Sequence, residues 1–162
     1  MEYDLRPYEA SFLSDATQLW NEIVEEGASF PGEVPLTPEE AERMFSNQTA
    51  TVCAMNGNRV IGLYILHPNG IGRLSHIANA SYAVKKECRG LGLGRVLVLD
   101  SIEKARENLF AAMQFNAVVA VNTRALNLYL KLGFTIVGTI KNGYRLKNGD
   151  YSDMLIFLKS FH

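Results

Sequence analysis

The stretch Arg89-Gly90-Leu91-Gly92-Leu93-Gly94 lies between a strand-like hydrophobic segment, residues 80–84, and a helix-like segment, residues 95–108. Three glycines in five residues let the main chain adopt positive φ angles and approach a ligand without Cβ atoms in the way. The first amides of the helix that follows lack partners inside the helix, and their partial positive charge points at the loop. The stretch therefore predicts an anion site, and a phosphate or pyrophosphate fits it best.

Two familiar phosphate loops do not fit this spacing. The dinucleotide fingerprint G-x-G-x-x-G needs a third glycine where Arg95 stands. The P-loop needs Lys followed by Ser or Thr after its last glycine, whereas Gly94 is followed by Arg95 and Val96. Since a glycine-rich run taken alone more often marks a turn, the interpretation depends on the sequence around it.

Two longer patterns surround the loop. The first is Tyr82-x-Val84-x-x-x-x-Arg89-x-x-Gly92-x-Gly94, and the second runs from Asn122 through Leu128-Tyr129 to Gly133-Phe134. They resemble, in the same order, the acetyl-CoA-binding signature and the later motif of the GCN5-related N-acetyltransferase (GNAT) superfamily. The resemblance covers residues 80–134. It implies a single N-acetyltransferase domain over residues 1–162, an acyltransferase with acetyl-CoA as cosubstrate.

Bulk composition agrees with one globular domain and excludes several other classes. The chain has 162 residues with 48% hydrophobic content, enough to bury its own core. Sixteen basic residues against seventeen acidic ones, without a long basic run, leave no electrostatic footprint for nucleic acid or an anionic membrane. No targeting or membrane-spanning segment is visible, so we expect a cytoplasmic protein. Cys53 and Cys88 have no metal-ligand spacing, and we expect free thiols and no metal.

Hydrophobic periodicity predicts alternating helices and strands. Thr37-Pro38-Glu39-Glu40 reads as the capped start of a helix, and Asn56-Gly57-Asn58 as a tight strand reversal. The expected strands are 3–6, 51–55, 60–66, 77–84, 116–121, 134–140 and 151–159, and the expected helices are 14–25, 38–45, 93–108 and 123–131. The resemblance implies a GNAT-like α/β fold: a mixed, mostly antiparallel sheet with two splayed central parallel strands, flanked by helices.

The resemblance also assigns cofactor-binding positions. In the family, pantetheine lies in the gap between the splayed strands and pairs with the backbone of the first. Main-chain groups of Tyr82, Ala83 and Val84 are thus expected to meet pantetheine. The pyrophosphate is expected on the amides of Arg89, Gly90, Leu91, Gly92, Leu93, Gly94 and Arg95. The two arginine side chains either add charge there or are ordinary solvated surface groups. Asn122 is expected to contact CoA and, from its position, to cap the helix after it.

Tyr129 is the candidate catalytic residue. It follows Asn122 by seven residues, so on a helix the two side chains share one face. A phenol with a pKa of about 10 stays protonated at neutral pH and can give its proton to the departing CoA thiolate. The alternative is a core aromatic, because Leu126, Leu130 and Leu132 surround it. His76 is a weak candidate for a general base, since no partner that would orient it is apparent.

The acceptor site rests on a finer resemblance. The stretches 76–82 and 115–119 resemble a branch of the superfamily that acetylates the imino nitrogen of proline analogues, and Asn79 and Asn116 match its paired asparagines. Their amide donors are expected to bind the carboxylate of a small amino or imino acid. Satisfied strand-end amides are the alternative reading. Glu33 would favour a cationic acceptor and Arg145 a carboxylate-bearing one, and the sequence does not say which faces the cleft.

Two other functions stay open at this point. An acetyltransferase that acts on protein N-termini or lysines would need an open groove. A CoA-binding regulatory module would keep the glycine loop without turnover, although an intact Tyr129 argues against it. The resemblance is also compatible with a homodimer.

Overall fold

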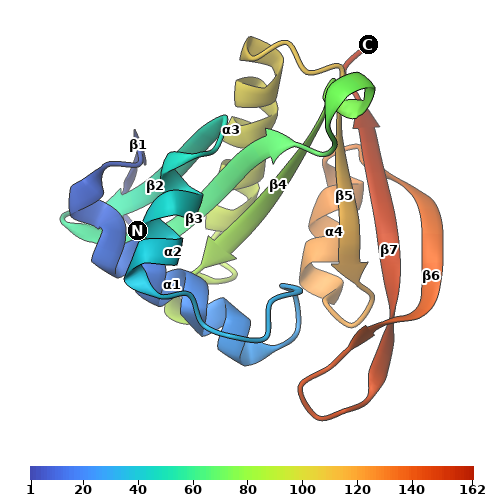
Figure 1. Ribbon diagram of the computed structural model, residues 1–162, viewed down its shortest axis with the longest axis horizontal. Helices are drawn as coiled ribbons and strands as arrows, with labels where there is room; N and C mark the ends of the chain where they lie inside the picture. Colours follow the sequence, from blue (N-terminus) through green and yellow to red (C-terminus); the bar gives the residue numbers. More distant parts are fainter.

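The computed structural model describes residues 1–162 and contains one seven-stranded sheet with the strand order β1-β2-β3-β4-β5-β7-β6 (Figure 1). Only β4 and β5 pair in parallel, and all other neighbours are antiparallel. The strands are β1 (Asp4–Pro7), β2 (Ala50–Asn56), β3 (Arg59–Pro68), β4 (Ile77–Val84), β5 (Ala112–Val119), β6 (Thr135–Arg145) and β7 (Tyr151–Ser160). The main helices are α1 (Leu13–Glu26), α2 (Pro38–Ser46), α3 (Leu93–Glu107) and α4 (Thr123–Lys131). This architecture confirms the expected fold class.

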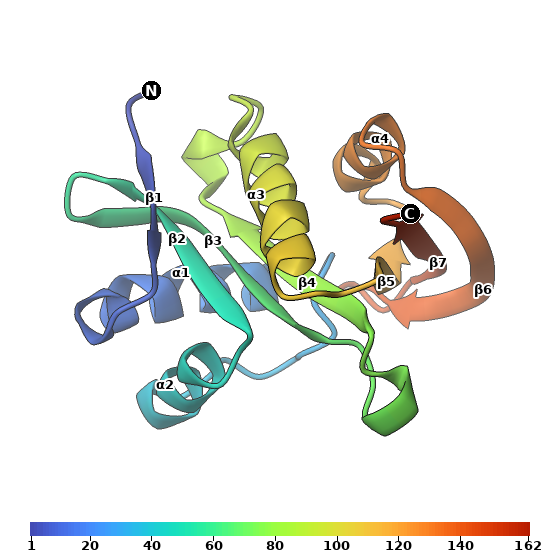
Figure 2. The same ribbon diagram turned by 90° about the horizontal axis from the view of Figure 1, so that it is seen from above.

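Helices cover both faces of the sheet: α1 and α2 lie on one side, α3 and α4 on the other (Figure 2). Since side chains alternate along a strand, the central strand β3 supplies both layers. Its Leu63 belongs to the core with Leu19 and Phe45, whereas its Tyr64 belongs to the core with Leu97. The sheet is therefore a partition, and a group that lies on one face reaches the other only where two strands separate.

Such a separation exists between β4 and β5. The two strands pair at Ile77 with Ala112 and at Ala78 with Met113, and nowhere beyond. On its other side, β5 pairs with β7 with an irregularity between Phe115 and Val118. A bulge of this kind bends the strand that carries it. The two strands thus form a fork that is closed at their N-terminal ends and open toward their C-terminal ends.

Helix starts agree with the predictions better than strand ends do. Thr37 accepts from the backbone of Glu40 and the Glu40 side chain bonds back, so the predicted cap of α2 is present. Strand β5, however, begins at Ala112, four residues before the predicted start. Strand β6 extends to Arg145 through a segment expected to be loop. No helix is long and apolar enough to span a membrane.

Cysteine and tyrosine side chains in apolar surroundings predict a loss of stability at alkaline pH. Burial raises the pKa of the fully buried Cys53 thiol to about 12, and it also raises the pKa of Tyr82 and Tyr129. An unfolded chain releases these protons at ordinary values of about 8.5 for Cys and 10 for Tyr, while the folded chain retains them. The free energy of unfolding is therefore expected to fall above pH 9 by about 1.4 kcal/mol per pH unit because of Cys53, and the two tyrosines steepen the fall above about pH 10.

Urea unfolding at pH 8 to 10.5 measures this slope. The Cys53→Ala variant should lose stability at pH 8, because a buried side chain is shortened, yet show a shallower decline between pH 9 and 10.5. A wild-type free energy that stays constant to pH 10.5 would contradict the expectation.

Candidate active site

The glycine loop has the amide-lined geometry that an anion requires. Gly90 and Gly92 adopt φ angles of +77° and +87°, whereas Gly94 is an ordinary residue of the first turn of α3. The first backbone bond that closes this turn runs from the Val96 N–H to the Gly92 carbonyl, and the N–H groups of residues 90–95 donate to no backbone acceptor. The Arg89 amide is the exception among the expected donors, since it donates to the Lys86 carbonyl. Six consecutive amides are thus free to meet an anion.

The Arg89 side chain holds the site together instead of facing a ligand. Its Nε donates to the Val84 carbonyl at 3.1 Å, and its Nη2 donates to Glu26 Oε1 at 2.6 Å. One guanidinium therefore joins the end of α1, the end of β4 and the glycine loop. Arg95 is exposed on the first turn of α3 and remains the arginine available to a bound anion.

Strand β4 offers a free backbone edge to the fork. The Lys85 N–H donates to Ile61 and the Asn69 N–H to Ile77, which shows that the odd-numbered residues of β4 exchange their hydrogen bonds with β3. The even-numbered residues beyond Ala78 therefore point their backbone groups into the fork. These residues are Ala80, Tyr82 and Val84.

This register changes the expected pantetheine contacts. The backbone of Ala83 faces Leu63 of β3 and not the fork, contrary to the expectation for Ala83, whereas the backbone of Ala80 faces the fork. At Val84 only the N–H is open, because the carbonyl accepts from Arg89. The alternation was readable from the sequence, but the edge of the strand that faces the gap was not.

Tyr129 lies in an aromatic cluster at the fork. Its ring centroid lies 4.5 Å from that of Phe115, 5.7 Å from Phe157 and 6.4 Å from Tyr82. Desolvation by these neighbours raises the pKa of the phenol, so it stays protonated throughout the neutral range. The only buried side-chain polar atom without a hydrogen-bond partner is the Tyr8 hydroxyl. The Tyr129 hydroxyl, which also makes no hydrogen bond, is therefore not sealed in the core. Asn122, at the start of the same helix, accepts from the Ala125 N–H at 3.4 Å and so acts as the cap.

Asn79 and Asn116 are brought together on the opposite face of the sheet, next to the closed end of the fork. Their neighbours in the chain, Ala78, Ala80 and Phe115, belong to the core between the sheet and α3. Because successive side chains of a strand point to opposite faces of the sheet, the two asparagines point toward α1 and α2. Each donates from Nδ2 to the same atom, Asn69 Oδ1, at 3.1 Å from Asn79 and 2.7 Å from Asn116.

Asn69, which joins the two asparagines, was not singled out from the sequence. It stands in a Pro-Asn-Gly segment after β3, and such a segment reads as a turn. The Asn69 N–H donates to the Ile77 carbonyl at 2.7 Å, which fixes the residue beside the start of β4. Only the pairing of β3 with β4 reveals that its side chain reaches both strands of the fork.

A groove of about 860 Å³ lies on the same side, between the α1–α2 connection and the β6–β7 arm, residues 142–152. Ala117, in the bulge of β5, belongs to its lining together with Phe30 and Tyr144. The Tyr144 hydroxyl donates to the Phe30 carbonyl at 2.6 Å, which ties the arm to the connection. The α1–α2 connection passes in front of the diverging ends of β4 and β5 (Figure 1).

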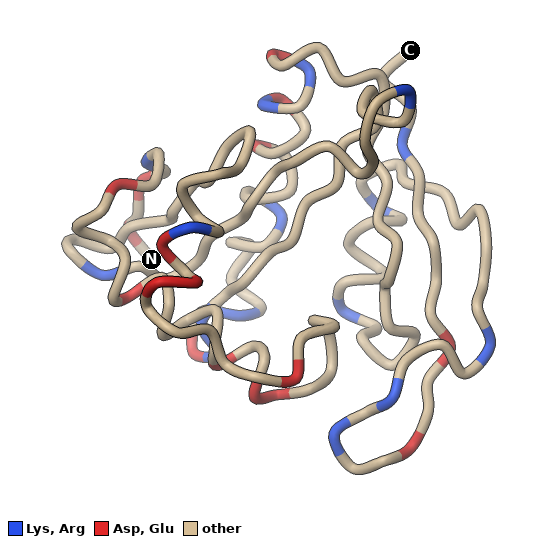
Figure 3. The backbone as a smooth tube through the Cα atoms, in the orientation of Figure 1, with Lys and Arg blue, Asp and Glu red and all other residues tan.

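The charges at the mouth of this groove compensate each other. Arg145 Nη2 lies 2.7 Å from Glu33 Oε1, so neither side chain presents an unpaired charge to an acceptor. Figure 3 shows acidic residues along α1 and its connection, and basic residues on the facing arm. Neither Glu33 nor Arg145 therefore has a free charge with which to recognise an acceptor.

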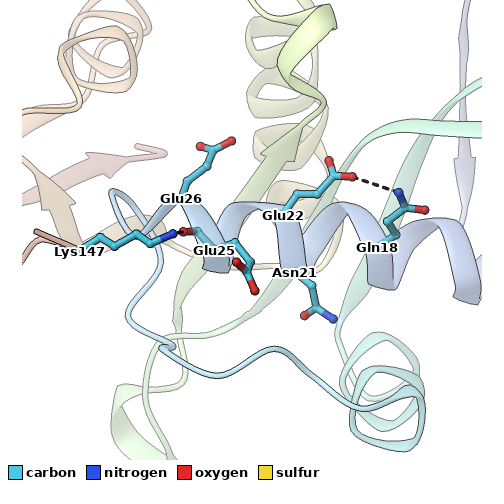
Figure 4. A pocket seen from close by; sticks show the side chains of 6 residues that line it. All are labelled: Gln18, Asn21, Glu22, Glu25, Glu26 and Lys147. Atoms are coloured by element: carbon cyan, nitrogen blue, oxygen red, sulfur yellow. Dashed lines mark hydrogen bonds between the residues drawn. The ribbon is translucent and has the colours of Figure 1, made fainter.

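Two other polar features lie outside this site. A shallow depression on α1, lined by Glu22, Glu25 and Glu26 among others, contains no apolar side chain and is crossed by Lys147, which donates to the Glu25 carbonyl (Figure 4). His76 is exposed, with Nδ1 3.1 Å from the Arg73 carbonyl. Of these residues only Glu26 is linked to the site, through its ion pair with Arg89.

The site as a whole fits a CoA thioester. Free amides of the loop suit a pyrophosphate, the open edge of β4 suits the amides of pantetheine, and a protonated phenol lies beside the fork. A family model described as the acetyltransferase (GNAT) family matches residues 16–134, and the chain belongs to this family. The protein is thus an acetyl-CoA-dependent N-acetyltransferase.

Similar proteins agree with this assignment. The N-acetyltransferase aca1 of Schizosaccharomyces pombe is 29% identical over 167 residues, which cover 92% of this chain and 80% of the relative. A GCN5-related N-acetyltransferase from Kribbella flavida has 30% identity and a TM-score of 0.91, with 98% of both chains covered. The phosphinothricin acetyltransferase of Sinorhizobium meliloti, solved with acetyl-CoA, shares the fold with a TM-score of 0.91 at 23% identity, over 99% of this chain and 89% of that one.

Proposed function

We propose that the protein acetylates the amino or imino nitrogen of a small acceptor that carries a carboxylate, by direct transfer from acetyl-CoA in a ternary complex. The observation that carries the proposal is the placement of groups on two sides of one fork. Tyr129 and the glycine loop lie on the α3 and α4 side, and the amides of Asn79 and Asn116 lie on the α1 and α2 side.

This placement gives each side one task. Bound acetyl-CoA supplies an activated acetyl group. The Tyr129 phenol, kept neutral by its apolar surroundings, would donate its proton to the thiolate that leaves. From the opposite face, amide N–H groups of Asn79 and Asn116 would hold an acceptor carboxylate and turn its nitrogen toward the fork.

Direct transfer is favoured over a covalent acetyl-cysteine. A nucleophilic cysteine needs a lowered pKa and access to the substrate. Cys53 has neither, because it is fully buried in the core under α1 and α2, where burial raises its pKa to about 12. Cys88 is also buried, within the core on the α3 side.

Thiol release from acetyl-CoA tests the proposal across amino acids, imino acids, polyamines, aminoglycosides and N-terminal peptides. Turnover confined to carboxylate-bearing small acceptors is the expected result. Turnover with peptides alone would move the assignment to protein acetylation. Tight binding of acetyl-CoA without turnover of any acceptor would favour a regulatory module.

Substitution of the paired asparagines gives the matching prediction. Asn79→Leu and Asn116→Leu should each raise the KM for the acceptor about tenfold, since a hydrogen bond to a charged group contributes about 1.5 kcal/mol or more. The KM for acetyl-CoA should stay unchanged, because both side chains point away from the cofactor side. An acceptor KM within twofold of wild type in both variants would contradict the carboxylate role.

A further inference from the structure

We infer that Asn69 is the positioning residue of the acceptor site and that Gln114 supports it; the inference rests on the proposed function. A single oxygen, Asn69 Oδ1, accepts from Asn79 on β4 and from Asn116 on β5. These strands stop pairing with each other after Ala78 and Met113. The shared oxygen is therefore a side-chain bridge across the two strands at the point where their backbone pairing ends.

Hydrogen-bond accounting couples the orientations of the amides in the cluster. A carboxamide oxygen has two lone pairs, and both of those on Asn69 Oδ1 are occupied. Gln114 Nε2 donates to Asn116 Oδ1 at 2.9 Å. Rotation of the Asn116 amide by half a turn would break two bonds and set its NH₂ against the Gln114 NH₂, and its oxygen against the Asn69 oxygen. A turn of one amide alone therefore costs hydrogen bonds, so the orientations of Gln114, Asn116 and Asn79 are coupled to one another through Asn69.

The network leaves hydrogen-bonding groups that can meet an acceptor. Asn79 and Asn116 each keep one N–H that is not used by Asn69, and Asn116 is exposed. Both lone pairs of the Asn69 oxygen are used, so the bridge holds these two N–H groups on the two strands of the fork. Together they suit an anionic or carbonyl oxygen of an acceptor. Because the donors are neutral amides and the nearby Arg145 is paired with Glu33, selection takes place without a fixed cation.

Two substitutions of Asn69 separate positioning from simple folding. Asn69→Leu removes the shared oxygen and frees both asparagines to rotate. Asn69→Asp keeps an oxygen that accepts both bonds but adds a negative charge beside the acceptor carboxylate. Ser75→Ala is the matched control, since Ser75 lies in the same connection and bonds only to the Gly72 carbonyl.

Kinetics with an acceptor acid and its primary amide form the first arm of the test. Asn69→Leu should raise the KM for the acid about tenfold, with kcat within threefold and the KM for acetyl-CoA unchanged. Asn69→Asp should raise the KM for the acid about tenfold, while the KM for the amide stays within threefold of wild type. The preference between the acid and the amide is then reversed. Ser75→Ala should match wild type. A change that is equal for the acid and the amide in both variants would mean a merely structural role and would overturn the inference.

Side-chain amide resonances of the ligand-free protein form the second arm, which does not depend on turnover. The Asn79 and Asn116 NH₂ signals should shift in Asn69→Leu and stay in place in Ser75→Ala. Unshifted signals would overturn the bridge itself. Failure of the wild type to use any carboxylate-bearing acceptor would instead overturn the proposed function, and the resonances distinguish these two failures.

Discussion

Tyr129→Phe is expected to lower kcat by about 100- to 1,000-fold, the range typical for removal of a general acid. The variant loses one hydroxyl and keeps the ring that packs on Phe115 and Phe157, so the fold and the KM for acetyl-CoA should be preserved. The raised pKa of the phenol sets the pH dependence. Because the active form is the protonated one, the wild-type kcat should show no decline attributable to Tyr129 up to about pH 10.

A second tyrosine supplies the control. Tyr64 is fully buried on β3, one strand away from the fork, and its hydroxyl donates to Asp100 Oδ2 at 2.6 Å. Tyr64→Phe should cost about 1.5–3 kcal/mol of stability, because a hydrogen bond to a carboxylate is lost, yet change kcat little. Steady-state kinetics and urea unfolding of both variants test whether the Tyr129 phenol is the general acid. A Tyr129→Phe enzyme with wild-type kcat would exclude the phenol as the acid.

Local chemistry explains which parts of the fold were predictable. The helix at 123–131 and the start of α3 were predictable because caps and glycine conformations are decided within a few residues. The ends of β5 and β6 were not. Ala112 is strand because it pairs with Ile77 and Ser160, and Arg145 is strand because it pairs with Tyr151. Both partners of Ala112 are far away in the sequence. Tyr151 is close to Arg145, but the Asn- and Gly-containing segment between them reads as loop until the two strands pair.

The same distinction holds for the site. Motif spacing located the glycine loop and Tyr129, because these positions are defined by short patterns. It also marked Arg89, but its partner Glu26 lies 63 residues away, and the ion pair turns an expected ligand-facing charge into a structural tie. Asn69 was overlooked since a turn-type residue gains a second role only after β3 and β4 pair. Long-range pairing, more than residue type, separates what was found from what was missed.

Alanine substitutions at two glycines of the loop, Gly92 and Gly94, are expected to have very different effects on stability and on acetyl-CoA binding. Gly92 has a φ angle of +87° with open space around the position of a Cβ atom, so Gly92→Ala meets no clash but carries the left-handed strain of an L residue. Gly94 is a helical glycine, and a Cβ there would lie at an ordinary 3.8 Å from Leu128 Cδ2. Gly92→Ala should therefore destabilise the ligand-free protein by about 1–2 kcal/mol, and Gly94→Ala should stabilise it by about 0.5–1 kcal/mol.

Binding of acetyl-CoA should separate the two variants further. Relief of the strain at residue 92 rotates the peptides on either side of it and turns at least one amide away from the pyrophosphate. The loss of one charge-assisted hydrogen bond, about 1.5–3 kcal/mol, raises Kd roughly 10- to 100-fold. Gly94→Ala leaves the first turn of α3 in place, so its Kd should stay within a few-fold of wild type. Calorimetric titration with acetyl-CoA, paired with urea unfolding, measures both quantities. Equal affinities for the two variants would show that the conformation of Gly92 does not set the anion site, and that the helix amides from Leu93 onward hold the pyrophosphate without the loop.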